Sequence, residues 1–201
     1  MDNRVVLDSD FCNMIAPGND KEKDKKFVKS IFESLDNKPI LHPFVCKEEL
    51  LSNIAIQELV NEGFIEVVGY DSFLKEDIFK TQYVDTFADF YTFMNGESIE
   101  WNFDVIKKHR AKRNMGEIHS LILAHYLSIP VFMSNDNGAK NLAASKINTQ
   151  AQCIVVKNVC EVFCDIKRFG AFQIDAKAVR AILKQREGWS EFYKTKTESR
   201  L

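Results

Sequence analysis

Acids that follow apolar runs are the residues of this chain best suited to do chemistry. Residues 4–7 form a short apolar run that ends at once in Asp8, with Asp10 two positions later. Pro130–Ser134 is a second apolar run, and Asp136 follows it. Both runs are typical of buried strands, and binding sites in open parallel sheets form beyond the carboxyl ends of the strands. We therefore expect Asp8 and Asp136 to lie at one edge of a sheet.

Two further acids are expected at the same edge. Glu117 opens a helix predicted over Met115–Leu127, and Glu49 lies in the first turns of a helix predicted over Lys47–Glu62. Four converging carboxylates would repel one another strongly without a cation. Their hard oxygen atoms suit Mg²⁺ or Mn²⁺, whereas no set of His and Cys has the spacing of a zinc site. The sequence therefore predicts a metal site made by Asp8, Glu49, Glu117 and Asp136.

Each of these acids also has an ordinary interpretation when it is taken alone. Glu117 is suited to the positive end of a helix dipole, Asp136 and Asn137 are typical turn residues, and Glu49 fits a solvated helix face. Asp8 is the exception, because an acid directly after a buried strand has no obvious structural role at the level of sequence.

The composition indicates one globular domain. The chain has 201 residues, 45% of them hydrophobic and 28% charged, and its 16 Phe indicate a well-filled core. A net charge of -2 gives no indication of nucleic-acid binding, but a local basic patch would be enough to bind a nucleic acid.

The cysteines and the chain start favour a reducing, cytoplasmic location. The number of Cys is odd and no CxxC pair occurs, so all are expected to be buried free thiols. Residues 1–10 carry acids and no long apolar run, which is unlike a signal peptide. The longest apolar stretch, Leu121–Met133, is too short to span a bilayer. The cysteines are Cys12, Cys46, Cys153, Cys160 and Cys164.

Helical and strand-like segments alternate along the chain, which predicts an α/β fold with three layers and a mostly parallel central sheet flanked by helices. The domain is expected over residues 1–185, with residues 186–201 as a C-terminal tail that docks on it. The predicted strands are residues 4–7, 39–44 (a strand or a turn), 64–68, 130–134 and 153–156. The predicted helices are residues 21–35, 47–62, 72–95, 115–127, 138–146, 158–167 and 175–185, and residues 101–114 are helical or looped.

A run of basic residues precedes Glu117 and has two interpretations. It is either a solvated face or a contact surface for the phosphate backbone of a nucleic acid. The four His, His119 and His125 among them, are interpreted as packing or surface residues. The RNA-binding candidates are Lys107, Lys108, Arg110, Lys112 and Arg113.

The acidic segments also carry a family resemblance. Together, and in this order, they resemble the acidic motifs of PIN-domain nucleases, in the branch whose helix starts with Gly-Glu. The resemblance covers about residues 4–185, with a weak interval over residues 67–113, and its most specific part is residues 116–136. The segments are Val5-Val6-Leu7-Asp8-Ser9-Asp10, Glu48-Glu49-Leu50, Gly116-Glu117-Ile118-His119-Ser120-Leu121-Ile122-Leu123-Ala124 and Val131-Phe132-Met133-Ser134-Asn135-Asp136.

The resemblance implies a Mg²⁺- or Mn²⁺-dependent endoribonuclease, often the toxin of a toxin–antitoxin pair. Asp8 and Asp136 would be primary metal ligands, Glu117 would bind the metal or orient water, Glu49 would complete a second metal position, and Ser134 would position water. The implied partners are an RNA substrate and, for a toxin, an antitoxin protein. No membrane partner is expected, and a homodimer is left open.

Two positions depart from the family pattern. Asn135 stands where many relatives have a further Asp, which bears on a second metal position, and Asp10 stands where Asn is common. One alternative is therefore a PIN-like module that binds RNA or a protein and cleaves weakly. Another is a haloacid-dehalogenase-like phosphohydrolase, in which Asp8 would be the nucleophile and Asp10 the general acid.

Overall fold

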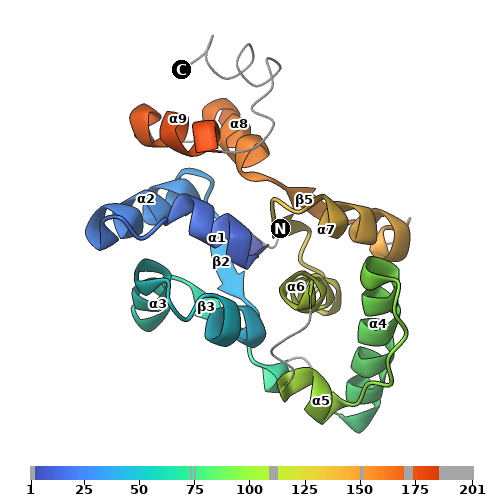
Figure 1. Cartoon of the computed structure of the whole chain (residues 1–201). Coiled ribbons are helices and arrows are strands. Elements are labelled where there is room, and N and C mark those ends of the chain that lie inside the picture. Colours follow the sequence, from blue (N-terminus) through green and yellow to red (C-terminus); the bar gives the residue numbers. More distant parts are fainter. Residues whose placement is uncertain are drawn as a thin grey trace.

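A five-stranded sheet forms the centre of the molecule. The computed structural model describes residues 3–72, 74, 76–108, 113–149, 152–169 and 174–185. All paired strands are parallel, and their order is β3-β2-β1-β4-β5 (Figure 1). The predicted α/β fold with a parallel sheet between helices is thus confirmed. The strands are β1 (Arg4–Leu7), β2 (Lys38–Leu41), β3 (Glu66–Val67), β4 (Val131–Met133) and β5 (Val155–Lys157).

Helices cover both faces of this sheet. In Figure 1, α1, α2 and α3 lie to one side of the strands, whereas α4 and α6 lie to the other. The helices are α1 (Ser9–Ile15), α2 (Lys21–Ser34), α3 (Ile54–Asn61), α4 (Asp77–Asn95), α5 (Phe103–Lys108), α6 (Met115–Tyr126), α7 (Asn137–Leu142), α8 (Val159–Phe169) and α9 (Ala176–Gln185). Shorter turns are η1 (Val45–Glu49), η2 (Tyr70–Ser72) and η3 (Ala143–Ile147).

Alternate residues of β1 supply two separate cores. Val5 and Leu7 pack with the apolar sides of α1, α2, α3 and α8. Val6 points to the other face and packs with α4, α6 and α7. Because successive side chains of a strand point to opposite faces, a strand covered on both sides must be apolar at every position. This is why the buried part of β1, Val5 to Leu7, is a continuous apolar run.

The helix predicted over Lys47–Glu62 is two elements. The turn η1 ends at Glu49, and α3 begins at Ile54, where the Asn53 side chain accepts a hydrogen bond from the Ile56 N–H. Asn is a strong helix N-cap, so it restarts the helix with a new direction. Leu51 and Ile54, on either side of this break, are both exposed, Leu51 to 72%.

Other boundaries and exposures differ from expectation more modestly. Helix α1 was not predicted, α4 begins at Asp77 and not at residue 72, and β5 begins at Val155. All five cysteines are free, but Cys153 is exposed and Cys164 is only partly buried, so the expectation of buried thiols is wrong at these two positions. The predicted tail, residues 186–201, lies outside the described residues.

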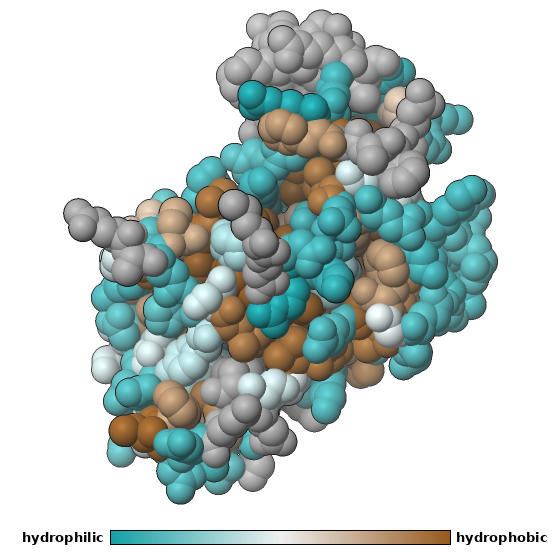
Figure 2. Space-filling model, turned by 180° about the vertical axis from the view of Figure 1, so that it is seen from behind, coloured by the Kyte–Doolittle hydropathy of each residue, from teal (hydrophilic) through white to brown (hydrophobic). Residues whose placement is uncertain are grey.

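None of the described helices combines the length and the apolar character that a membrane crossing requires. Figure 2 views the molecule from the side opposite to Figure 1 and shows hydrophilic residues at the periphery, with apolar residues between them near the centre.

Candidate functional site

The order of the strands places the site between β1 and β4. The chain adds β2 and β3 on one side of β1 and then returns to add β4 and β5 on the other side. Crevices form where the strand order reverses in this way. Leu7 pairs with Met133, and the Asp8 N–H donates to the Met133 carbonyl at 3.0 Å. Asp8 and the residues after Met133 therefore leave the sheet side by side, as predicted.

Asp8 is fully buried, and both of its carboxylate oxygens accept hydrogen bonds. Oδ1 accepts from the Ser9 N–H at 2.8 Å, which makes Asp8 the N-cap of α1, and Oδ2 accepts from the Ser134 hydroxyl at 2.8 Å. Asp8 thus has a structural role that the sequence did not reveal. Burial, followed by the charges of Glu117 and Asp10, nevertheless raises the pKa of Asp8 well above its usual range.

Ser134 connects the acids at the ends of the two central strands. Its hydroxyl donates to Asp8 and accepts from the Asp136 N–H at 3.1 Å. Asp136 in turn caps α7, because its Oδ1 accepts from the Gly138 N–H at 2.5 Å. The single hydroxyl hydrogen of Ser134 is given to Asp8, so Ser134 orients the acid, whereas the resemblance implied a role in positioning water.

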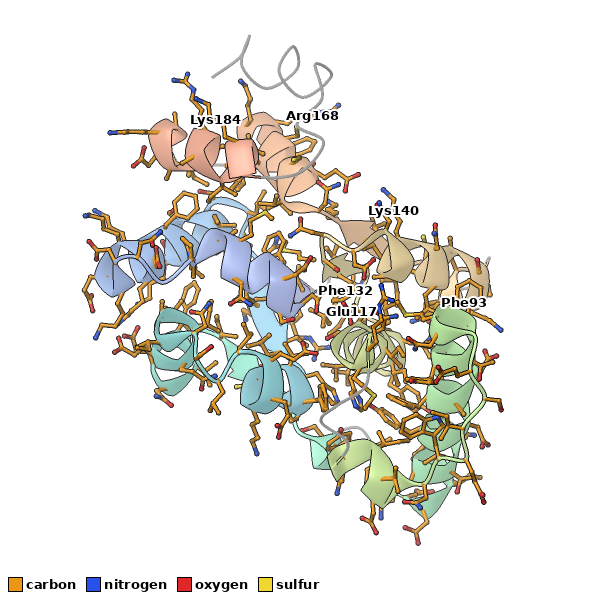
Figure 3. All side chains as sticks on the ribbon, viewed as in Figure 1. Phe93, Glu117, Phe132, Lys140, Arg168 and Lys184 are labelled. Atoms are coloured by element: carbon orange, nitrogen blue, oxygen red, sulfur yellow. The ribbon has the colours of Figure 1, made fainter. Side chains whose placement is uncertain are left out.

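Glu117 lies in the first turn of α6, at the centre of the view in Figure 3. Burial raises its pKa to about 7, and the charges of Glu49, Asp136 and Asp10 act in the same direction. Its own backbone N–H opposes the shift. A pKa this close to neutrality is unusual for a Glu and is characteristic of groups that exchange protons or bind cations.

Glu49 reaches across to α6 from the turn after β2. A Cβ added at Gly116 would lie 2.6 Å from Glu49 Cδ and closer still to Oε2, so only glycine leaves room for this carboxylate. Burial and the charge of Asp10 raise the pKa of Glu49, and hydrogen bonds from Ser9 and from the Gly116 N–H partly oppose them. Its Oε2 is buried and has no hydrogen-bond partner among the described residues.

Asp10 and Asn135 flank these acids at the surface. Asp10 is exposed, and its Oδ1 accepts from the Asn135 N–H at 3.3 Å. The Asn135 side-chain carbonyl accepts from the Val159 N–H at 3.0 Å, at the start of α8. Asn135 therefore joins the segment after β4 to the start of α8.

The acids fit a hard divalent cation by chemistry but do not form a finished site. Across the part of the chain that the structure describes, no three His, Cys, Asp or Glu side chains are arranged to hold one metal ion. Burial and, after it, the charges of neighbouring acids nevertheless raise the pKa values of Asp8 and Glu117, and the buried Glu49 Oε2 has no hydrogen-bond partner among the described residues. A cation would have to draw these side chains together.

The basic run is only partly described. Lys107 is exposed near the end of α5, with its Nζ 4.5 Å from the centroid of the Phe103 ring, and Arg113 is also exposed. Residues 109–112, which include Arg110 and Lys112, lie outside the described residues, as does the side chain of Lys108. Among these candidates the structure describes the side chains of Lys107 and Arg113 alone, and contact of the run with a nucleic acid stays a prediction.

A buried cluster of His and Tyr adjoins the acids and was not anticipated. The rings of His42 and His119 stack at 4.5 Å, and the Tyr83 hydroxyl lies 2.5 Å from His119 Nδ1. Burial lowers the pKa of His119 to about 3, and the His42, Tyr83 and His119 side chains are all fully buried, which agrees with the packing role predicted for His119. His42 directly follows β2, and the strand-end rule applied to Asp8 would have found it.

The chain matches no family model, no curated protein and no solved structure. The resemblance to PIN-domain nucleases therefore rests on the quoted motifs.

Proposed function

We propose that the chain is a metal-dependent endoribonuclease that hydrolyses phosphodiester bonds at the carboxylates between β1 and β4. The observation that carries this proposal is the electrostatic coupling of acids from separate segments. The pKa values of Asp8, Glu49 and Glu117 are each raised in part by the charge of another acid, at the strand-order reversal where such folds bind ligands. Crowding of this kind costs stability, and a bound cation would offset the cost.

The donor set decides which cation is expected. All side chains that would hold it offer carboxylate oxygens, the ligands that Mg²⁺ and Mn²⁺ prefer. Asp8 and Asp136 would be the first pair, because Ser134 links them, and Glu117 and Glu49 would complete the set from α6 and η1. A bound divalent cation supplies an activated water and stabilises charge on the phosphate.

The chain's own residues would orient the reaction and move its proton. Glu117 would either help to hold the cation or orient the attacking water and accept its proton. The water oxygen forms a bond to phosphorus as the bond to the 3′ oxygen breaks, and the proton passes to that leaving oxygen. The products would be a 5′-phosphate and a 3′-hydroxyl.

Cleavage of a mixed pool of RNA tests the proposal. The wild-type protein is expected to cut with Mn²⁺, to stop with EDTA, and to leave 5′-phosphate ends. Asp8→Asn and Asp136→Asn should each remove cleavage, whereas Asp104→Asn, which changes an exposed acid of α5, should not. Full activity of the Asp8 or Asp136 variant would refute the assignment.

The same assay separates the two alternatives. Binding of RNA without cleavage in Mn²⁺ would identify a binding module. Release of phosphate from p-nitrophenyl phosphate, lost in Asp8→Asn and Asp10→Asn, would identify a phosphohydrolase. The toxin role is a finer proposal that rests on the resemblance, and it predicts that expression of the wild type, but not of Asp8→Asn, arrests growth of the host.

A further inference from the structure

An open hollow of about 370 Å³ lies beyond the carboxyl ends of β2 and β3, and part of its lining belongs to η1, the turn that carries Glu49. A volume of this order is enough for a small ligand such as one nucleotide. Its walls come from the segment after β2, the segment after β3, and α5, and Figure 1 shows the last two next to each other. The residues that line it include Phe44, Lys47, Glu48, Gly69, Tyr70 and Lys107.

The floor of the hollow is held in place by aromatic contacts. The Tyr70 ring meets His42 at 4.9 Å, Phe103 at 5.3 Å and Tyr83 at 5.8 Å between ring centroids, each at close to a right angle. Edge-to-face contacts of this kind are favourable and directional. Tyr70 is therefore fixed before any ligand binds, which lowers the entropic cost of binding.

Two ammonium groups line this hollow. Lys47 and Lys107 are both exposed, and neither makes an ion pair with a described residue. Lys107 Nζ lies 5.5 Å from the centroid of the Tyr70 ring, which places its charge over the floor. Glu48 also lines the hollow.

The hollow is connected to the acids by shared elements. Lys47 and Glu49 belong to the same turn, η1, so one short segment carries both a cation for the hollow and a carboxylate for the site. The Phe44 ring packs 4.8 Å from His119, which lies two residues after Glu117 in α6. The shared turn and this ring contact join the hollow to the segments that carry Glu49 and Glu117.

We infer that the hollow binds a nucleotide of the single-stranded RNA substrate next to the cleavage site, with its phosphate between Lys47 and Lys107. The inference rests on the proposed function, since it takes its substrate from it. The lysines neutralise a backbone phosphate without reading sequence, and Tyr70 and Phe44 give the base an apolar surface. The hollow thus fixes the register of the strand relative to the acids.

Binding of a short fluorescein-labelled single-stranded RNA in EDTA tests the inference without any cleavage. Lys47→Gln and Lys107→Gln should each weaken binding about fivefold at 0.1 M salt and lower the log–log salt slope by about 0.7, the value for one phosphate contact. Lys38→Gln is the matched control, because Lys38 is an exposed lysine at the opposite end of β2.

Gly69→Phe tests the space and leaves both lysines in place. A Cβ added at Gly69 meets no atom within 4 Å, so the variant should fold and fill the hollow. It should weaken RNA binding, and thermal melting checks the fold of every variant. Binding by the Lys47, Lys107 and Gly69 variants equal to that of Lys38→Gln would overturn the inference.

The outcome is separable from that of the nuclease proposal. If the wild type never cleaves RNA with Mn²⁺ but the variants lose binding as stated, the hollow is an RNA contact and the nuclease assignment fails. If the wild type cleaves and the variants bind normally, the nuclease stands and the hollow is not its subsite.

Discussion

The carboxylate of Glu49 occupies the space that a side chain at position 116 would need. A Cβ on Gly116 would lie 2.5 Å from Glu49 Oε1 and 2.6 Å from Cδ. A side chain at position 116 would therefore clash with the Glu49 carboxylate in its present position. This relationship explains why the helix that carries Glu117 has a glycine in its first turn, although glycine costs helix stability.

Gly116→Ala is therefore expected to displace Glu49 and to impair metal-dependent cleavage. The fold should survive, because the group that must move is the end of a flexible side chain. In a Glu49→Ala background the same change should stabilise the protein by about 0.5–1 kcal/mol, the usual helix gain of Ala over Gly. Urea unfolding of the four proteins of this cycle measures it, and an equal effect of Gly116→Ala in both backgrounds would contradict the steric relationship.

Ser134→Ala is expected to destabilise the protein by about 1–3 kcal/mol. The change leaves Asp8 Oδ2 and the Asp136 N–H without their partner, and buried groups left unpaired carry that cost. Ser120→Ala is the matched control, because Ser120 is buried on α6 and its hydroxyl has no partner among the described residues. Chemical denaturation should show Ser120→Ala to be neutral or stabilising; a similar loss in both variants would mean that only volume matters.

Glu117→Gln should remove a pH dependence of stability in EDTA. The pKa of Glu117 is about 7 in the folded protein and about 4.5 in the unfolded chain. Its contribution to the free energy of unfolding is therefore fully present below pH 4.5 and is lost as the pH rises through 7. The melting temperature of Glu117→Gln, relative to that of the wild type, should therefore rise between pH 4.5 and pH 7. The expected gain is on the order of 2 kcal/mol, or roughly 4–8 °C.

Two buried histidines, His42 and His119, make the stability of the protein change with pH in the opposite direction. Burial lowers the pKa values of His42 and His119, so their contribution to the free energy of unfolding is present above pH 6.5 and is lost as the pH falls. The comparison must therefore be the difference between variant and wild type, with Glu33→Gln, an exposed acid of α2, as control. A constant difference from pH 4.5 to 7 would show that Glu117 is not perturbed.

Mn²⁺ should raise the melting temperature of the wild type. A cation that binds only the folded state stabilises it by mass action, by about 2.7 kcal/mol at a hundred times its Kd. Asp8→Asn should lose most of this shift and should be as stable as the wild type, or more so, in EDTA, because one of the crowded charges is gone. Asp104→Asn should keep the full shift. Equal shifts in the Asp8 variant and the wild type would place the cation elsewhere.

The fold class and the strand-end acids follow from the sequence because each rests on a local pattern. The apolar run before Asp8 predicts a strand buried on both faces, and the alternation of such runs with helical spacing predicts a parallel sheet. Parallel strands end at one edge, so the sequence alone suffices to place Asp8 and Asp136 close together. Capping signals such as Asn53 are visible too, but their weight against a continuing apolar pattern is hard to judge from sequence.

Tertiary structure alone decided the roles that depend on contacts between distant segments. The hydrogen bond from Ser134 to Asp8 joins residues 126 positions apart, and the close contact of the Glu49 carboxylate with Gly116 joins η1 to α6. The pKa of Glu117 and the hollow between Lys47 and Lys107 arise in the same way, from burial and from charges brought together by folding. Sequence records which groups are present, whereas burial and proximity determine how strongly they interact, and both are properties of the folded chain.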